Sequence, residues 1–169
     1  MQPLKYLTNY SQETRDQVQS LITNNILGEH LLKKYPKTHP YLSDKTLYDY
    51  VIDLKNSHLR NSSPLSKVLY DTKIRDLHSA LGTHTFISRV QGGKLKAKNE
   101  IRISHLFKKV PEPFLRMIVT HELAHLKEKE HNKSFYSLCT HIEPHYYQLE
   151  FDLRLYLTHI DRFGKLYTD

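Results

Sequence analysis

The feature that most restricts the fold and chemistry of this chain is the pentapeptide His-Glu-Leu-Ala-His at residues 121–125. Residues four positions apart lie on one face of an α-helix, one turn from each other. His121 and His125 would therefore present two imidazoles to one metal ion, and neutral nitrogen ligands suit Zn²⁺. The opposite face of the segment is apolar, at Leu115, Val119, Leu123 and Leu126. The pattern predicts an amphipathic helix with a metal site on its polar side.

A catalytic zinc site needs a third protein ligand and a base. Glu122 follows the first histidine, so we expect it to face the open coordination position and take a proton from the attacking water. His131 is the candidate third ligand. On a straight helix it would lie about 240° around the axis from His125, too far to share an ion. The helix must therefore break between Leu126 and His131, and Asn132 could cap a new helix there.

The segment from Thr120 to Tyr136 resembles the YgjP-like metallopeptidase family, whose members are minimal zincins distantly related to SprT-like proteases. The resemblance covers roughly residues 73–156. Two features depart from the family pattern: residues 80–84 keep only the glycine of the usual Arg-Trp-Gly-Ser-Cys, and Tyr136 replaces a tryptophan. The resemblance implies a glutamate base at Glu122 and three zinc ligands, His121, His125 and His131.

The rest of the chain supplies a fold prediction. Helices are expected after Ser11 and after Ser43, where serine can cap a helix ahead of apolar residues at helical spacing. Residues 82–90 and 94–103 are predicted to form an antiparallel hairpin around a Gly-Gly turn, with one apolar and one basic face. Two C-terminal helices follow, one from Asn132 to before Pro144 and one that ends near Gly164.

These elements predict an α+β, zincin-like fold. It would combine a small antiparallel sheet, an HExxH active-site helix, C-terminal helices and a helical N-terminal extension. The loop Asn61-Ser62-Ser63-Pro64 marks the predicted boundary. Residues 1–63 would be a helical N-terminal region, and residues 64–169 a zincin-like metallohydrolase domain on which that region packs as one compact unit.

The chain is basic, and the excess is local. With 25 Lys+Arg against 18 Asp+Glu, the formal net charge is +7. Residues 89–109 hold seven basic side chains and one acidic one. This basic hairpin could contact nucleic acid or a nucleotide, or it could be a strand edge that its lysines protect from aggregation.

Composition also excludes several classes of protein. No apolar run is long enough for a membrane span, and the first residues do not resemble a signal peptide, so a cytoplasmic protein without a membrane partner is expected. Cys139 is the single cysteine, which rules out an internal disulfide and a cysteine-based zinc knuckle.

The sequence therefore predicts a metallopeptidase that uses one zinc ion on a peptide or protein substrate. Three alternatives stay open. The same site could hydrolyse a nucleotide or another phosphoanhydride. The chain could be a nucleic-acid-associated protease of the SprT type. It could also be a binding module in which the zinc is only structural.

Overall fold

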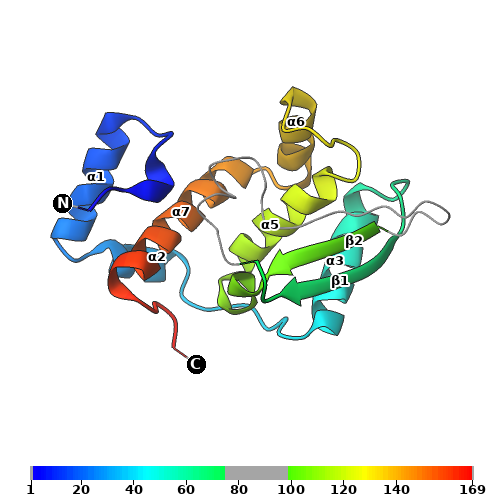
Figure 1. Cartoon of the computed structure of the whole chain (residues 1–169), viewed down its shortest axis with the longest axis horizontal. Helices are drawn as coiled ribbons and strands as arrows, with labels where there is room; N and C mark the ends of the chain where they lie inside the picture. Colours follow the sequence, from blue (N-terminus) through cyan, green and yellow to red (C-terminus); the bar gives the residue numbers. More distant parts are fainter. Residues whose placement is uncertain (1, 75–98, 169) are drawn as a thin grey trace.

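The computed structural model describes residues 2–74 and 99–168, and it has an α+β architecture, as predicted (Figure 1). A short 3-10 helix comes first, and a second one follows the strands. The elements are η1 (Lys5–Leu7), α1 (Gln12–Thr23), α2 (Leu27–Lys34), α3 (Asp44–His58), β1 (Leu65–Asp71), β2 (Asn99–Ser104), η2 (His105–Lys109), α5 (Glu112–Ala124), α6 (Lys133–Ile142) and α7 (Tyr146–Phe163).

Side-chain hydrogen bonds at the first residues of α1 and α3 confirm the two predicted helix starts. The Ser11 side chain accepts a hydrogen bond from Thr14 N, and Ser43 forms a capping box with Thr46. Between α1 and α2, Asn25 takes a positive φ of 58°, a conformation that asparagine tolerates better than most residues and that ends the first helix. Local hydrogen bonding thus sets these helix ends.

The antiparallel sheet was predicted wrongly. Within the described residues, β1 and β2 pair in parallel, with Val68 opposite Ile101 and Tyr70 opposite Ile103. Parallel strands need a connection of a dozen or more residues, and 27 residues separate Asp71 at the end of β1 from Asn99 at the start of β2. The predicted strand at 82–90 and its Gly-Gly turn lie outside the described residues. The expected alternation does hold over 99–103, where Ile101 and Ile103 are buried.

Strand β1 was missed because a register irregularity breaks its pattern. The pairing shifts between Leu65 and Lys67, so the buried residues of the strand are Leu65, Val68 and Tyr70 instead of every second residue. A bulge of this kind removes the alternation that identifies a half-buried strand in a sequence.

Helix α5 lies at the centre of the molecule, beside β2 and across from α7 (Figure 1). Every residue from Met117 to Ala124 is buried, polar ones included. The buried hydrophobic side chains form one cluster that runs from Leu7 to Leu157. Helix α7 contacts α5, α6, α2 and η1, so it joins the N-terminal helices to the central helix. Among the described helices, none combines the length and apolar character needed to cross a bilayer.

One buried carboxylate fixes α2 against α7. The side chain of Asp152 is only 3% exposed, and it accepts hydrogen bonds from Lys34 Nζ at 2.6 Å and from the buried Tyr35 hydroxyl at 2.5 Å. Gln148 Nε2 donates to its other oxygen at 3.0 Å. Removing this carboxylate would leave the Tyr35 hydroxyl buried without its acceptor.

We expect Asp152→Ala to lower the free energy of unfolding by about 2–4 kcal/mol, because it removes one partner of a buried charged network. The matched control is Asp49→Ala, whose partner Lys45 lies at 3.0 Å on the exposed surface of α3. That change should cost less than about 0.5 kcal/mol. Urea denaturation of both variants measures the difference, and equal losses would contradict the role given to Asp152.

Candidate metal centre

The three predicted histidine ligands come together in the structure. One ligand atom from each of His121, His125 and His131 lies within 4.8 Å of the other two. The Nε2 atom of His121 is 3.3 Å from Nε2 of His125 and 3.2 Å from Nε2 of His131. Tetrahedral nitrogen ligands at about 2.0–2.1 Å from one Zn²⁺ are about 3.3–3.4 Å apart. The donor set therefore fits a zinc ion in both chemistry and spacing.

The break that brings His131 back to the helix occurs without a glycine. Helix α5 ends at Ala124, and His125 is its C-cap. The amides of Leu126 and Lys127 then bond the carbonyls three residues earlier, which tightens the last turn into 3-10 geometry. The Asn132 side chain accepts a hydrogen bond from Phe135 N at 2.9 Å and starts α6, as predicted.

Hydrogen bonds on the far side of two rings fix their orientation. Nδ1 of His121 lies 2.8 Å from the hydroxyl of the buried Tyr146, and Nδ1 of His125 lies 2.9 Å from the carbonyl oxygen of Glu128. With the proton assigned to Nδ1 in both rings, each Nε2 keeps its lone pair directed at the cluster. Sequence reasoning did not find these supports, because neither a backbone carbonyl nor a tyrosine 25 residues from His121 carries a local signal.

The electrostatics keep the imidazoles neutral. Burial, and then the neighbouring rings of His125 and His131, lowers the pKa of His121 well below its usual range. Burial also lowers the pKa of His125, although the hydrogen bond to the Glu128 backbone opposes the shift. Neutral imidazole is the form that binds a metal, so these rings are ready to act as ligands at neutral pH.

Phe135 forms the packing support beneath the histidines. Its ring is fully buried, with its centroid 4.9 Å from that of His121, 4.6 Å from that of His125 and 4.8 Å from that of His131. A single aromatic ring in contact with all three imidazoles limits their movement. Phe135 therefore packs beneath the loop that carries His131.

Glu122, the predicted base, is buried at 1% exposure on the same turn of α5 as His121. Four other histidines were weaker candidates for ligands, and the structure does not bring the described ones into the cluster. His105, His141 and His145 lie elsewhere in the described residues, and His84 lies outside them. Cys139 is a buried residue of α6, consistent with a packing role.

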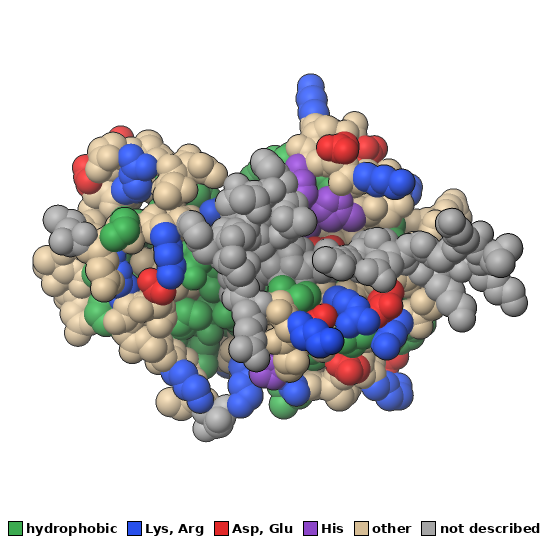
Figure 2. Space-filling view, viewed as in Figure 1, with side chains coloured by type: hydrophobic (Ala, Val, Ile, Leu, Met, Phe, Trp, Pro, Cys, Tyr) green, Lys and Arg blue, Asp and Glu red, His purple; other side chains and the backbone are tan. Residues whose placement is uncertain are grey.

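The described part of the predicted basic segment, residues 99–109, contains three basic side chains, and one of them, Arg102, forms ion pairs with acidic groups. Arg102 pairs with Asp71 at 3.3 Å and with Glu100 at 2.7 Å. Figure 2 shows histidine side chains grouped at the surface, and basic and acidic side chains mixed together over the strands. Lys94, Lys96 and Lys98 lie outside the described residues, so the basic face of the predicted hairpin stays a prediction.

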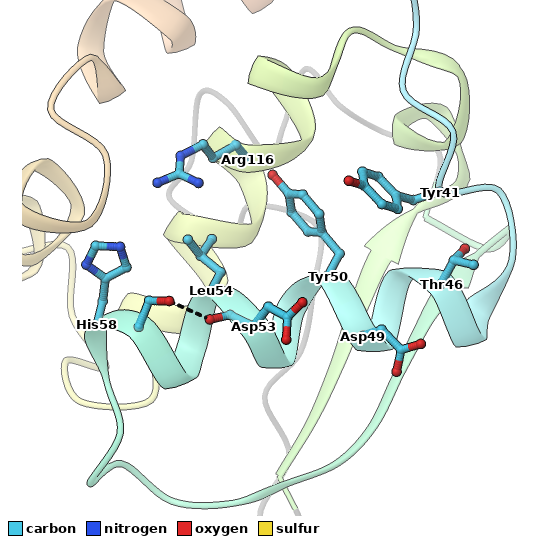
Figure 3. A pocket seen from close by; sticks show the side chains of 9 residues that line it. Tyr41, Thr46, Asp49, Tyr50, Asp53, Leu54, His58 and Arg116 are labelled. Atoms are coloured by element: carbon cyan, nitrogen blue, oxygen red, sulfur yellow. Dashed lines mark hydrogen bonds between the residues drawn. The ribbon is translucent and has the colours of Figure 1, made fainter.

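A pocket of about 490 Å³ lies on the other side of α5, between that helix and α3 (Figure 3). Two of its polar groups already have partners: Arg116 pairs with Glu143 at 2.7 Å, and the Tyr50 hydroxyl donates to Glu112 at 2.5 Å. None of the three clustered histidines lines it. The metal centre is therefore a separate feature of the molecule.

A cluster of three histidines on and after an HExxH helix that also carries a buried glutamate is typical of metal-dependent hydrolases. Comparison with known sequences supports this class. The family profile described as "YgjP-like, metallopeptidase domain" matches residues 88–156. A curated relative, "UTP pyrophosphatase" of Escherichia coli (strain K12), is 60% identical over 160 residues, which cover 95% of this chain and 96% of that protein. No solved structure matches the chain.

This chain belongs to the YgjP-like family, as its sequence indicated. The family description and the name of the relative both indicate an enzyme that hydrolyses its substrate. They differ on the bond that is broken, because one refers to a peptidase and the other to a pyrophosphatase.

Replacement of the third ligand should abolish stoichiometric metal binding. We expect purified wild-type protein to contain about one zinc ion per chain and His131→Ala to lose most of it, since two histidines alone hold zinc weakly. The matched control is His141→Ala, an exposed histidine on α6. Metal analysis by mass spectrometry measures both. Equal zinc contents in the two variants would exclude His131 as a ligand.

Loss of the Tyr146 hydroxyl should weaken the site without removing a ligand. We expect Tyr146→Phe to lower zinc affinity by about 10- to 100-fold, because the Nδ1 proton of His121 loses its acceptor. The control is Tyr156→Phe, a buried tyrosine further along α7. Competition with a chromogenic chelator measures the affinities, and an unchanged value for Tyr146→Phe would contradict the supporting role.

Proposed function

We propose that this protein is a zinc-dependent pyrophosphohydrolase of nucleoside triphosphates and that UTP is a substrate. The observation that carries the proposal is the near full-length relative, 60% identical to this chain and named a UTP pyrophosphatase. The three-nitrogen cluster supports it, because three protein ligands would leave a fourth coordination position of a zinc ion for water or a substrate oxygen.

His121, His125 and His131 would hold the ion, which when bound supplies a Lewis acid that polarises the substrate and lowers the pKa of water. The chain's own groups do the rest. The Tyr146 hydroxyl and the Glu128 carbonyl keep the rings of His121 and His125 oriented. Glu122 would be the general base, since it is a buried carboxylate beside the first ligand.

In the proposed reaction, a water molecule attacks the α-phosphorus of UTP. The new bond joins the water oxygen to that phosphorus, and the bond from phosphorus to the oxygen bridging the α and β phosphoryl groups breaks. A Glu122 carboxylate oxygen takes the proton that the water loses. The products are UMP and pyrophosphate, so atoms and charge balance without another reactant.

A second candidate is peptide hydrolysis, which the family description favours. The same groups would serve it: Glu122 would take a proton from water and deliver it to the leaving amine. A nucleic-acid-associated protease is a variant of this candidate. It depends on the basic segment 89–109, of which the structure describes residues 99–109.

Three further expectations accompany the proposal. The first is a zincin-like architecture, which we expect because the HExxH helix lies beside the small sheet. The division at residue 63 into a helical region and a hydrolase domain, and the cytoplasmic location, rest on the sequence alone.

The proposal is tested with zinc-loaded protein on UTP, other nucleoside triphosphates and a peptide library. We expect pyrophosphate release from UTP, and a fall of about 10²- to 10⁴-fold in kcat for Glu122→Gln with zinc content unchanged. The matched control is Glu130→Gln. Glu130 is an exposed carboxylate next to His131, so this variant should retain activity.

Cleavage of peptides without turnover of any nucleotide would replace the proposal by the second candidate. If Glu122→Gln kept full activity on every substrate, Glu122 would not be the base.

A further inference from the structure

Two tyrosines extend the histidine cluster toward solvent. The ring of Tyr136 on α6 lies 5.9 Å from the ring of Tyr147 on α7, with 27° between their planes. Tyr147 is 56% exposed, the largest value among the exposed large hydrophobic side chains of the described residues. We call Tyr136 and Tyr147 the tyrosine pair. One face of Tyr147 is against Tyr136, so much of the rest of the ring is available to a ligand.

Two chains of ring contacts connect the tyrosine pair to the metal centre. On one side, the His131 ring lies 6.4 Å from that of Tyr136. On the other, the His121 ring lies 6.4 Å from that of Tyr146, which in turn lies 5.7 Å from Tyr147. The exposed ring is thus one intervening ring away from two of the three histidines.

The surroundings of the tyrosine pair are compatible with an anionic substrate. Glu150, the carboxylate that acts electrostatically on both rings, is paired with Arg154 at 3.0 Å. Its negative charge is therefore compensated within α7. A ligand whose phosphates reach the histidines would not meet an unpaired carboxylate beside the tyrosines.

We propose that the tyrosine pair is the surface on which the base of the nucleotide stacks while its phosphates lie at the histidine cluster. This inference rests on the proposed function. In a nucleoside triphosphate the ribose separates the base from the α-phosphorus, and in this protein one intervening ring separates Tyr147 from His121 and from His131. An aromatic side chain stacks on any base, because every base has a π-face. The tyrosine pair would thus select nucleotides over inorganic polyphosphates.

The test uses zinc-loaded full-length protein with three variants. Tyr147→Ala removes the ring, and Tyr147→Phe keeps it without the hydroxyl. Phe163→Ala is the matched control, because Phe163 is an aromatic residue of similar exposure, 47%, at the other end of the same helix. Calorimetry measures the affinity for UMP and, separately, for pyrophosphate, and steady-state kinetics measures KM and kcat for UTP.

We expect Tyr147→Ala to weaken UMP binding by about 5- to 100-fold and to raise KM for UTP, because a lost base–aromatic stack costs affinity in this range. Pyrophosphate affinity and zinc content should stay as in the wild type. Tyr147→Phe and Phe163→Ala should bind UMP within about twofold of the wild type, because the stacking ring remains in both.

Two results would overturn the inference alone, and a third would overturn the proposed function as well. If Tyr147→Ala binds UMP as the wild type does, or loses UMP and pyrophosphate affinity equally, the base does not stack there, although UTP turnover would still support the proposed function. If the wild type hydrolyses peptides but neither binds UMP nor turns over nucleotides, the proposed function and this inference both fail.

Discussion

The structure depends on holding three imidazoles close together in a largely buried place. Mutual repulsion and loss of hydration both disfavour protonated rings there, and the pKa of His121 is lowered for these reasons. The protein must therefore supply neutral rings in fixed orientations before any ion binds. It does so with a central helix that is buried from Met117 to its end at Ala124, a loop that returns to this helix, and Phe135 in contact with all three rings. Helices α6 and α7 pack against α5 and against each other, and this packing holds the loop in place.

Much of the site was predictable because it depends on residues that are close together in the sequence. The spacing of His121 and His125 specifies a helix face, and the angle to His131 requires a break. Asn132 is a residue type that starts a new helix, and it does. The N-terminal helices were predictable for the same reason, since Ser11 and Ser43 cap them by hydrogen bonds to residues three positions away.

The rest could not be predicted because it depends on contacts between distant segments. The parallel pairing of β1 with β2 joins residues more than 30 positions apart. The register irregularity after Leu65 also removes the alternation of buried and exposed residues by which β1 could have been predicted. The sequence does not indicate whether the hydroxyl of Tyr146 or that of its neighbour Tyr147 lies at the histidine cluster. The fold places the Tyr146 hydroxyl at Nδ1 of His121 and leaves Tyr147 exposed.

The contacts at the two ends of α7 limit where the sequences of this family can change in length. Its first turn carries Tyr146 at the metal centre, and near its other end Asp161 binds Lys5 and Arg162 donates to the Gln2 carbonyl. A one-residue insertion between those ends would rotate everything beyond it by about 100° and would separate one set of contacts from its partners. Insertions and deletions among relatives should therefore accumulate in the connecting loops and leave the length of α7 unchanged. This helix thereby fixes the distance between the N-terminal residues and the histidine cluster.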